Sequence, residues 1–194
     1  MRGNDGILGV DTGIYTTMSK HQYAIREALS RVCGGAESYL EVGVNEGTSL
    51  EVVINECTTV KSLTLVDMWG KEYGGTGRGS NAHIKDLLNK LGYTGEARFL
   101  DGNSHDILPQ LIAEGVSFDL VTIDGDHSYE GGERDLIDGW QLLNSKGWLV
   151  FDDITHEQHG YLMDMTKKFE ANYSPANSIW ITDLINGAVA FQKP

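Results

Sequence analysis

Short apolar runs in this chain alternate with segments in which apolar residues recur every three or four positions. The runs predict buried strands near residues 39–42, 62–67, 97–100, 118–123 and 148–151, with two closing strands near 178–182 and 188–192. The recurring segments predict helices between these strands, and the first helix is expected over 19–32 behind a Ser19–Gln22 capping box. Alternation of this kind predicts an α/β fold with a mostly parallel sheet.

The stretch YLEVGVNEGTSL, residues 39–50, predicts a strand, a turn and a helix in immediate succession. Gly43 and Gly47 allow a tight turn, and Thr48 with Glu51 fits a capping box. The helical face that follows is Leu50, Val53, Ile54 and Cys57. Such a turn presents free backbone N–H groups at the carboxyl end of a sheet, where open α/β sheets bind nucleotides.

Apolar periodicity marks the later helices as well. The expected buried faces are Ile84, Leu87, Leu88 and Leu91, then Leu136, Trp140 and Leu143, then Tyr161, Leu162, Met165 and Phe169. Gly147 is expected to precede the fifth strand. The glycine-rich segment 68–80, which contains Trp69, Lys71, Tyr73 and Arg78, is expected to be a loop, either a binding loop or a surface insertion.

Length, charge and cysteine content limit the kinds of protein that this chain can be. The 194 residues suggest one domain over 17–194 behind a flexible arm, 1–16, and no apolar run reaches the length of a membrane span. Fifteen basic against 28 acidic residues give a formal net charge of −13, which disfavours nucleic acid and anionic membranes as partners. Cys33 and Cys57 are expected as reduced thiols inside helices of a cytoplasmic protein. The oligomeric state stays open, with a homodimer as one option.

Acidic residues stand at the predicted strand ends. Asp67 follows Glu41 by 26 positions and is expected to accept hydrogen bonds from the two hydroxyls of a ribose. Asp124, Asp152 and Asp153 end the fourth and fifth strands, where they should converge and repel one another unless a cation lies among them. Carboxylate oxygens suit Mg²⁺ or Ca²⁺. The alternative is that Asp124 and Asp152 only cap helices and bind the methionine part of a cofactor.

Two motifs resemble the class I S-adenosylmethionine (SAM) methyltransferases. They are Glu41-x-Gly43-x-x-x-Gly47 and GNSHDILPQL at 102–111, and the second is similar to catechol O-methyltransferase and its relatives. The resemblance implies a Rossmann-like doubly wound seven-stranded sheet, mostly parallel, with an antiparallel C-terminal edge hairpin. It implies SAM binding by Glu41, Gly43, Ser49, Asp67, Met68, Gly102, Ser104, His105 and Asp124. Ser104 and His105 would contact the adenine, although the catechol enzymes carry an amide in place of His105.

The same resemblance extends to a metal site and a base. Asp124 and Asp152 are 28 positions apart, as are the metal-binding acids of the catechol enzymes. Those enzymes have Asn where this chain has Asp153, whereas an Asp pair occurs in metal-dependent sugar and aminocoumarin O-methyltransferases. His127 occupies the position of the family's catalytic Lys. Imidazole titrates near neutrality, so His127 is expected to be the general base, with His156 as the second candidate.

These features together predict a SAM-dependent O-methyltransferase that uses a divalent metal and acts on a hydroxyl of a small molecule, a sugar or a phenol. Two alternatives remain: a SAM-binding protein without transfer activity, and an N- or C-methyltransferase that uses no metal. An oxidoreductase that binds NAD is disfavoured, because the chain lacks G-x-G-x-x-G after its first strand.

Overall fold

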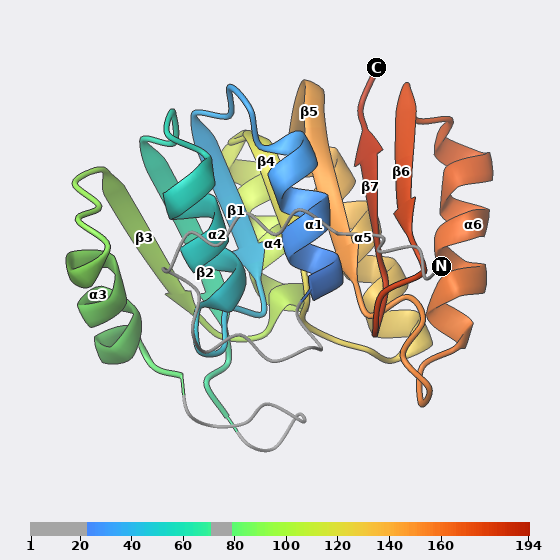
Figure 1. Cartoon of the computed structure of the whole chain (residues 1–194), viewed down its shortest axis with the longest axis horizontal. Helices are drawn as coiled ribbons and strands as arrows, with labels where there is room; N and C mark the ends of the chain where they lie inside the picture. The colour runs from blue at the N-terminus through green and yellow to red at the C-terminus, as the bar shows by residue number, and fades with distance from the viewer. Residues whose placement is uncertain (1–22, 71–78) are drawn as a thin grey trace, which may run out of the picture.

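A computed structural model describes residues 23–70 and 79–194, which build one seven-stranded sheet with helices on both faces (Figure 1). The strands are β1 (Ser38–Val42), β2 (Ser62–Asp67), β3 (Glu96–Asp101), β4 (Phe118–Ile123), β5 (Leu143–Asp152), β6 (Asn177–Ile181) and β7 (Ala188–Gln192). The helices are α1 (Tyr23–Val32), α2 (Thr48–Glu56), α3 (Asn81–Lys90), α4 (Ser104–Glu114), α5 (Tyr129–Leu142) and α6 (Tyr161–Tyr173). The strand order is β3-β2-β1-β4-β5-β7-β6, and β7 pairs antiparallel with both of its neighbours. The predicted fold class is confirmed.

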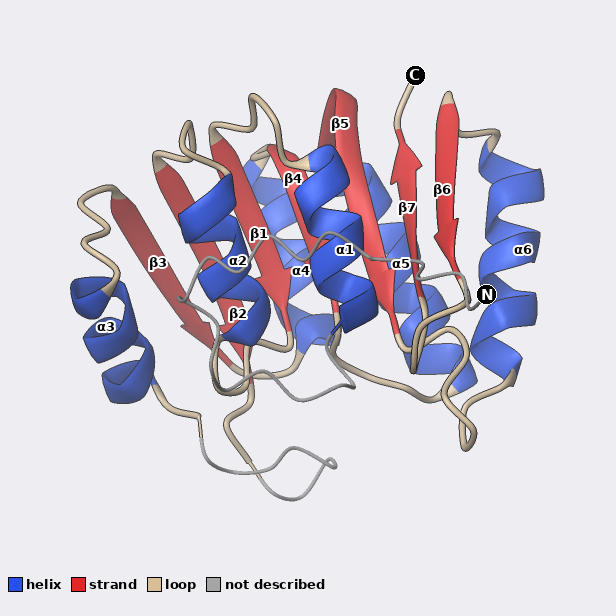
Figure 2. Ribbon diagram, viewed as in Figure 1, coloured by secondary structure: helices blue, strands red, loops and turns tan. Residues whose placement is uncertain are grey.

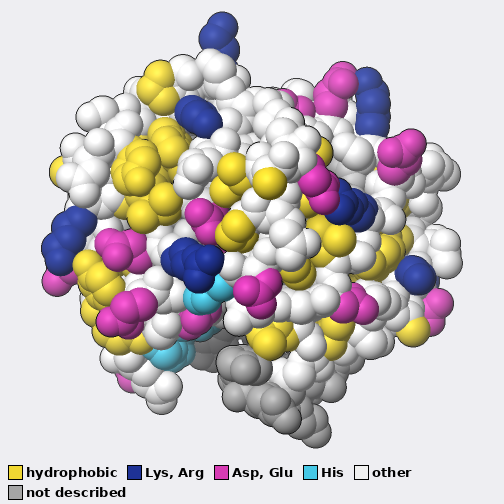
Figure 3. Space-filling view, turned by 180° about the vertical axis from the view of Figure 1, so that it is seen from behind, with side chains coloured by type: hydrophobic (Ala, Val, Ile, Leu, Met, Phe, Trp, Pro, Cys, Tyr) yellow, Lys and Arg dark blue, Asp and Glu magenta, His cyan; other side chains and the backbone are white. Residues whose placement is uncertain are grey.

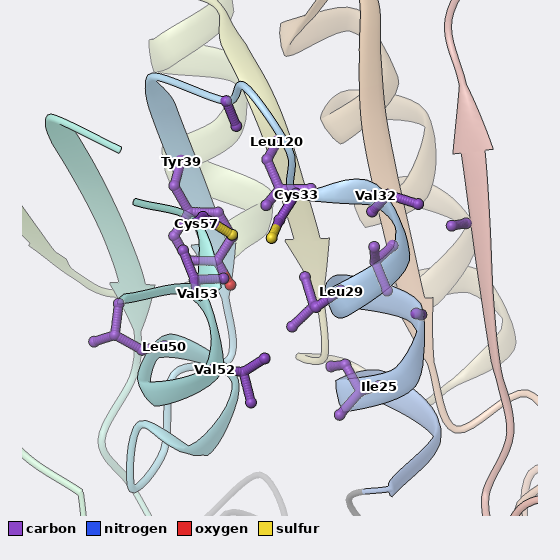
Figure 4. Close-up of a cluster of buried hydrophobic side chains, with 14 of the residues drawn as sticks. Ile25, Leu29, Val32, Cys33, Tyr39, Leu50, Val52, Val53, Cys57 and Leu120 are labelled. Atoms are coloured by element: carbon purple, nitrogen blue, oxygen red, sulfur yellow. The ribbon is translucent and has the colours of Figure 1, made fainter. Parts of the chain in front are cut away.

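Each face of the sheet has its own apolar core. Helices α1, α2 and α3 cover one face, and α4, α5 and α6 cover the other, which leaves three layers (Figure 2). On the first face, Leu29 of α1 and Val53 of α2 pack with Tyr39 of β1 (Figure 4). Cys33 and Cys57 are free thiols buried in this core, as expected, but they lie just beyond the ends of α1 and α2 rather than inside the helices.

The parallel register places the functional turns at one edge of the sheet. Val42 pairs with Val66 of β2 and Ile123 of β4, and Ile123 pairs with Phe151 of β5. The residues that follow these pairs therefore emerge together, at the lower ends of the strands in Figure 1. Four turns far apart in the sequence meet there.

Some local predictions were wrong. Gly47, not Thr48, is the N-cap of α2, with φ 82°, and because glycine has no side chain this position makes no side-chain capping hydrogen bond. Leu143 begins β5 instead of ending α5, and Gly147 lies inside β5, where the pairing with β4 shifts register. Tyr161 is 38% exposed and does not belong to the buried face of α6.

Several predictions concern residues outside the described part of the chain. They are the arm 1–16, the Ser19–Gln22 capping box and residues 71–78 of the glycine-rich loop. Among the described residues, no helix has the length and apolar content needed to cross a membrane.

Candidate active site

The turn after β1 packs directly against the end of β4. Gly43 has φ 86°, and a Cβ there would lie 2.0 Å from the carbonyl oxygen of Asp124. The Gly43 N–H donates to the Val66 carbonyl at 3.0 Å, and the Asp124 N–H donates to the Val42 carbonyl at 2.8 Å. The conformation and the close contact each require glycine. The predicted glycine turn is therefore the point where β1, β2 and β4 are held together.

Asp67 ends β2 with its carboxylate fixed by two backbone donors. Oδ2 accepts from the Asn45 N–H at 2.7 Å, and Oδ1 accepts from the Trp69 N–H at 2.6 Å. An ionised carboxylate has about four acceptor sites, so each oxygen keeps capacity for another donor. This geometry suits a vicinal diol, which is the role expected of Asp67. Sequence analysis did not single out Asn45, because its contribution is a backbone N–H in the turn.

The turn after β3 joins the same edge. Asp101 pairs with Asp67, and the Gly102 N–H donates to the Asp67 carbonyl at 3.0 Å. The Asn103 side chain accepts from the His105 N–H at 2.9 Å and caps α4, so Ser104 and His105 form its first turn. Of the other expected cofactor contacts, Met68 is 39% exposed after β2, and Ser49 is buried in the first turn of α2.

Glu41 lies beneath the glycine turn, buried to 1% exposure, and its Oε2 has no hydrogen-bond partner among the described residues. Burial raises the pKa of this carboxyl well above its ordinary value; the Tyr39 side chain opposes the rise, and Asp124 and Asp67 add to it. The expected cofactor-binding acid is thus part of the buried floor of the site.

Of the three predicted metal-binding carboxylates, Asp152 ends β5, and Asp124 and Asp153 directly follow β4 and β5. Ligand atoms of Asp124, His127 and Asp153 lie within 4.8 Å of one another. The His127 Nε2 is 3.4 Å from Asp124 Oδ1 and 3.5 Å from Asp153 Oδ2. Asp153 reaches this cluster from a left-handed backbone, φ 59°. The structure therefore brings His127 into the acidic cluster.

Asp152 is not in that cluster of three. It is 5% exposed, and its Oδ1 has no hydrogen-bond partner in the described parts of the chain. Burial raises its pKa well above the ordinary value, and the charges of Asp124 and Asp153 raise it further. A buried carboxylate with an unsatisfied oxygen is unfavourable in a protein lacking a compensating cation. An oxygen-ligated divalent cation fits this donor set.

The charged groups of the cluster shift one another's pKa values. Burial raises the pKa of Asp124; His127 opposes the rise, and Asp153 and Asp67 support it. For His127, burial lowers the pKa, but Asp124, Asp153 and Asp126 raise it, and the net direction is upward. The site is a concentration of negative charge, which favours cations such as a divalent ion or the sulfonium of SAM.

A group of rings borders the acidic cluster. His159 stacks on His156 with ring centres 4.8 Å apart and lies 5.3 Å from the His127 ring. Tyr161 donates its hydroxyl hydrogen to the His127 carbonyl at 2.6 Å and lies 3.1 Å from His159 Nδ1. Figure 3 shows histidine side chains gathered beside acidic ones near the lower edge of one face. Sequence analysis missed Tyr161, whose contacts depend on α6 beginning beside the turn after β4.

Asp135 was also missed. It lies in α5 at 0% exposure, in the same stripe as Gly131, Leu136 and Gly139. The sequence did contain a signal for it, because the helical repeat places position 135 on the buried face of the helix, where a charged residue is unusual. Its Oδ1 is 3.5 Å from the Nε2 of His105, one of the expected cofactor contacts.

Solved structures of similar architecture include several methyltransferases. The O-methyltransferase NovP matches with 17% identity and TM-score 0.60, over 90% of this chain and 79% of that one. TomG from Streptomyces achromogenes, solved with SAM, matches with 18% identity and TM-score 0.62, over 92% and 82%. An O-methyltransferase from Bacillus cereus, solved with S-adenosylhomocysteine, has 12% identity and TM-score 0.60, over 88% and 79%. The TM-scores show that these proteins and this chain share a fold.

The strand order is that of the Rossmann-like fold which these methyltransferases share. The family model described as a methyltransferase domain matches residues 40–154, more than half of the chain. The chain belongs to this methyltransferase family. No match was found among curated protein sequences.

Proposed function

We propose that this protein is a SAM-dependent O-methyltransferase that requires a divalent metal and acts on a hydroxyl of a small molecule, of the sugar or phenol and catechol type. The observation that supports it is the gathering of Asp124, His127 and Asp153 within 4.8 Å of one another, next to a buried Asp152. The Oδ1 of Asp152 has no hydrogen-bond partner in the part of the chain that the structure describes, and the charges of Asp124 and Asp153 act on this carboxyl. We also propose that residues 17–194 form a single methyltransferase domain behind the arm 1–16.

Asp124, Asp152 and Asp153 would hold the ion, Mg²⁺ or Ca²⁺, which when bound lowers the pKa of a coordinated hydroxyl and offsets the repulsion of the carboxylates. The remaining work falls to residues of the chain. Asp67 and the turns after β1 and β3 would hold SAM so that its methyl group faces the acidic cluster. Positioning the two reactants in this way accounts for much of the rate enhancement that the protein has to supply.

His127 would take the proton of the acceptor hydroxyl. Its Nε2 faces Asp124 Oδ1 and Asp153 Oδ2, both acceptors, so the ring proton belongs on Nε2 and Nδ1 keeps a lone pair. His156 is the weaker candidate, because its Nδ1 already accepts from the Gln158 N–H at 3.2 Å. That contact leaves a neutral His156 without a free lone pair.

Calorimetry tests this function. S-adenosylhomocysteine is titrated into the protein with and without Mg²⁺, and Mg²⁺ is then titrated into the complex. We expect product binding, and a metal site that is lost in Asp152→Ala but kept in Asp183→Ala, the removal of an exposed carboxylate in the turn between β6 and β7. Product binding without a metal site would favour the metal-free alternatives, a SAM-binding protein or an N- or C-methyltransferase. Methyl transfer that continues unchanged in the presence of a chelator would favour the N- or C-methyltransferase.

A further inference from the structure

Asp135 is a buried carboxylate that the proposed chemistry does not use. Its exposure is 0%, and neither of its oxygens has a hydrogen-bond partner of good geometry within the described residues. Burial raises its pKa to about 6, against the influence of the Ser104 side chain and of His105. Burying such a group costs free energy unless a neighbour compensates. The His105 ring lies beside it, with Nε2 3.5 Å from Oδ1.

His105 is held by α5 through its backbone as well as its ring. Residue 109 is proline, which has no N–H to donate to the carbonyl four residues earlier in α4. That carbonyl belongs to His105, and Arg134 of α5 donates to it at 2.7 Å. The His105 Nε2 in turn lies 3.3 Å from the Gly131 carbonyl. The first turn of α4 is thus fixed to α5 at two points.

These contacts select one tautomer of His105. Both groups that face Nε2, the Gly131 carbonyl and the Asp135 carboxylate, only accept hydrogen bonds. In the neutral ring Nε2 therefore carries the hydrogen, and Nδ1 is left as an acceptor. A buried carboxylate that orients a histidine in this way is known from hydrolase triads, where its loss allows the wrong tautomer.

The position of His105 places its Nδ1 acceptor on the side of the site where the adenine of the cofactor would bind. Asp67, the proposed ribose anchor, is joined to the turn after β3 by the Gly102 N–H, and His105 follows in the first turn of α4. The methionine end of SAM has to reach toward Asp124, so the base extends to the other side of the ribose, toward α4. Adenine presents a 6-amino donor there, and an Nδ1 acceptor complements it.

We propose that Asp135 is a positioning residue that, with the Gly131 carbonyl, keeps His105 in the Nε2–H tautomer, so that Nδ1 accepts a hydrogen bond from the adenine amino group. His105 is then the residue that makes the protein specific for an adenosyl cofactor. This inference rests on the proposed placing of the ribose at Asp67, but it does not depend on a metal or on the acceptor.

The first test reads the tautomer directly. A long-range ¹H–¹⁵N spectrum of the labelled, metal-free protein near pH 8 is recorded, with His105 assigned by its disappearance in His105→Gln. We expect the pattern of an Nε2–H imidazole. The averaged pattern of a free ring, or that of an Nδ1–H ring, overturns the proposal.

The second test compares S-adenosylhomocysteine with S-inosylhomocysteine, in which a 6-oxo acceptor replaces the amino donor. By calorimetry the wild-type protein should prefer the adenosyl compound by about tenfold or more, because the 6-oxo group would face an acceptor. His105→Gln, whose amide oxygen can also accept, should keep the preference. His105→Ala should reduce the ratio to near one. A ratio near one in the wild-type protein, or a preserved ratio in His105→Ala, overturns the proposal.

Asp135→Leu separates positioning from simple stability. It removes the carboxylate without adding a donor, and we expect the ratio of the two dissociation constants to fall severalfold toward that of His105→Ala. Glu130→Gln, the loss of an exposed acid in the first turn of α5, should leave the ratio unchanged. If Asp135→Leu weakens both compounds equally, Asp135 is only structural and the proposal fails. If Asp135→Leu does not fold, the spectrum and the His105 variants still decide. Absence of metal binding would count against the proposed function alone, because the ratio is measured without metal.

Discussion

The Nε2 of His127 lies 3.4 Å from Oδ1 of Asp124, the residue that directly follows β4. The turn after β4 thus brings the proposed base back onto the proposed metal-binding acid. Asp153 approaches the same nitrogen from the end of β5, at 3.5 Å. Proton transfer and metal binding are consequently proposed to occur within one small cluster.

Loss of His127 should remove the basic group from the pH dependence of the rate. We expect His127→Ala to lower kcat by about 10²–10⁴ and to abolish the fall in rate toward acid pH, since general-base catalysis contributes gains of this order. The measurement is kcat against pH with saturating metal and SAM. His156→Ala is the control and should keep the acid limb. A His127→Ala enzyme with an unchanged pH profile would exclude His127 as the base.

Asp152 should stabilise the protein only when a cation is present. In chelated protein, Asp152→Asn removes a buried carboxyl whose ionised form is opposed by burial and by the charges of Asp124 and Asp153. We expect it to raise the free energy of unfolding by about 1–2 kcal/mol, or Tm by about 2–8 °C. Adding Mg²⁺ should raise the Tm of the wild-type protein above that of the variant. Thermal unfolding with and without chelator measures both effects. A less stable variant under chelation would show that Asp152 has a compensating partner already.

Gly43 should not tolerate a side chain. In Gly43→Ala the new Cβ would lie 2.0 Å from the Asp124 carbonyl oxygen, on a backbone with positive φ. We expect a loss of about 3 kcal/mol or more in unfolding free energy, together with weakened S-adenosylhomocysteine binding. Gly34→Ala is the matched control, because a Cβ there meets no atom within 4 Å. Equal stability of the two variants in urea denaturation would contradict the structural reason given for Gly43.

Asp67 should contribute to cofactor affinity through the ribose hydroxyls. Replacing it with Asn removes the charge and one acceptor, and we expect the dissociation constant of S-adenosylhomocysteine to rise about 10–100-fold. An analogue lacking the 2′-hydroxyl should show a much smaller difference between wild type and variant. Asp86→Asn, an exposed acid on α3, is the control and should bind like the wild type. If the full cofactor and the analogue lose affinity equally, Asp67 does not bind the diol.

Asp119, which lies outside the candidate active site, allows a prediction of how the stability of the protein changes at acid pH. Burial raises its pKa, but hydrogen bonds from the Asn144 side chain and from Glu37 and Ser38 outweigh this effect and lower it overall. A lowered folded-state pKa means that the stabilisation is present above the unfolded value of about 3.9 and is lost as pH falls through the folded value.

Asp119→Asn should accordingly cost about 1–3 kcal/mol in urea denaturation at pH 7. The difference from wild type should stay constant down to about pH 5 and shrink below about pH 4. Asp183→Asn, an exposed acid, should show no such difference. If the difference in unfolding free energy between wild type and Asp119→Asn grew as the pH fell, the prediction would be contradicted.

The sequence alone determined the elements and their order. Apolar runs of strand length and apolar residues at helical spacing are local signals, and they located β2, β4 and β7 at the bounds seen in the structure. The placing of Asp67, Asp124 and Asp152 at strand ends followed from the same signals, since parallel strands in register end at one edge of the sheet.

Only the tertiary structure decided which side chains touch. Gly43 is required because Asp124, 81 positions later, packs against it, and His105 is oriented by Asp135 from another helix. The closeness of His127 and Asp153 depends on the left-handed backbone of Asp153. Such contacts join residues that are far apart in the sequence, so they do not follow the helical or strand repeat. They depend on how the turns direct side chains at the sheet edge. Local pattern carries no information about that direction.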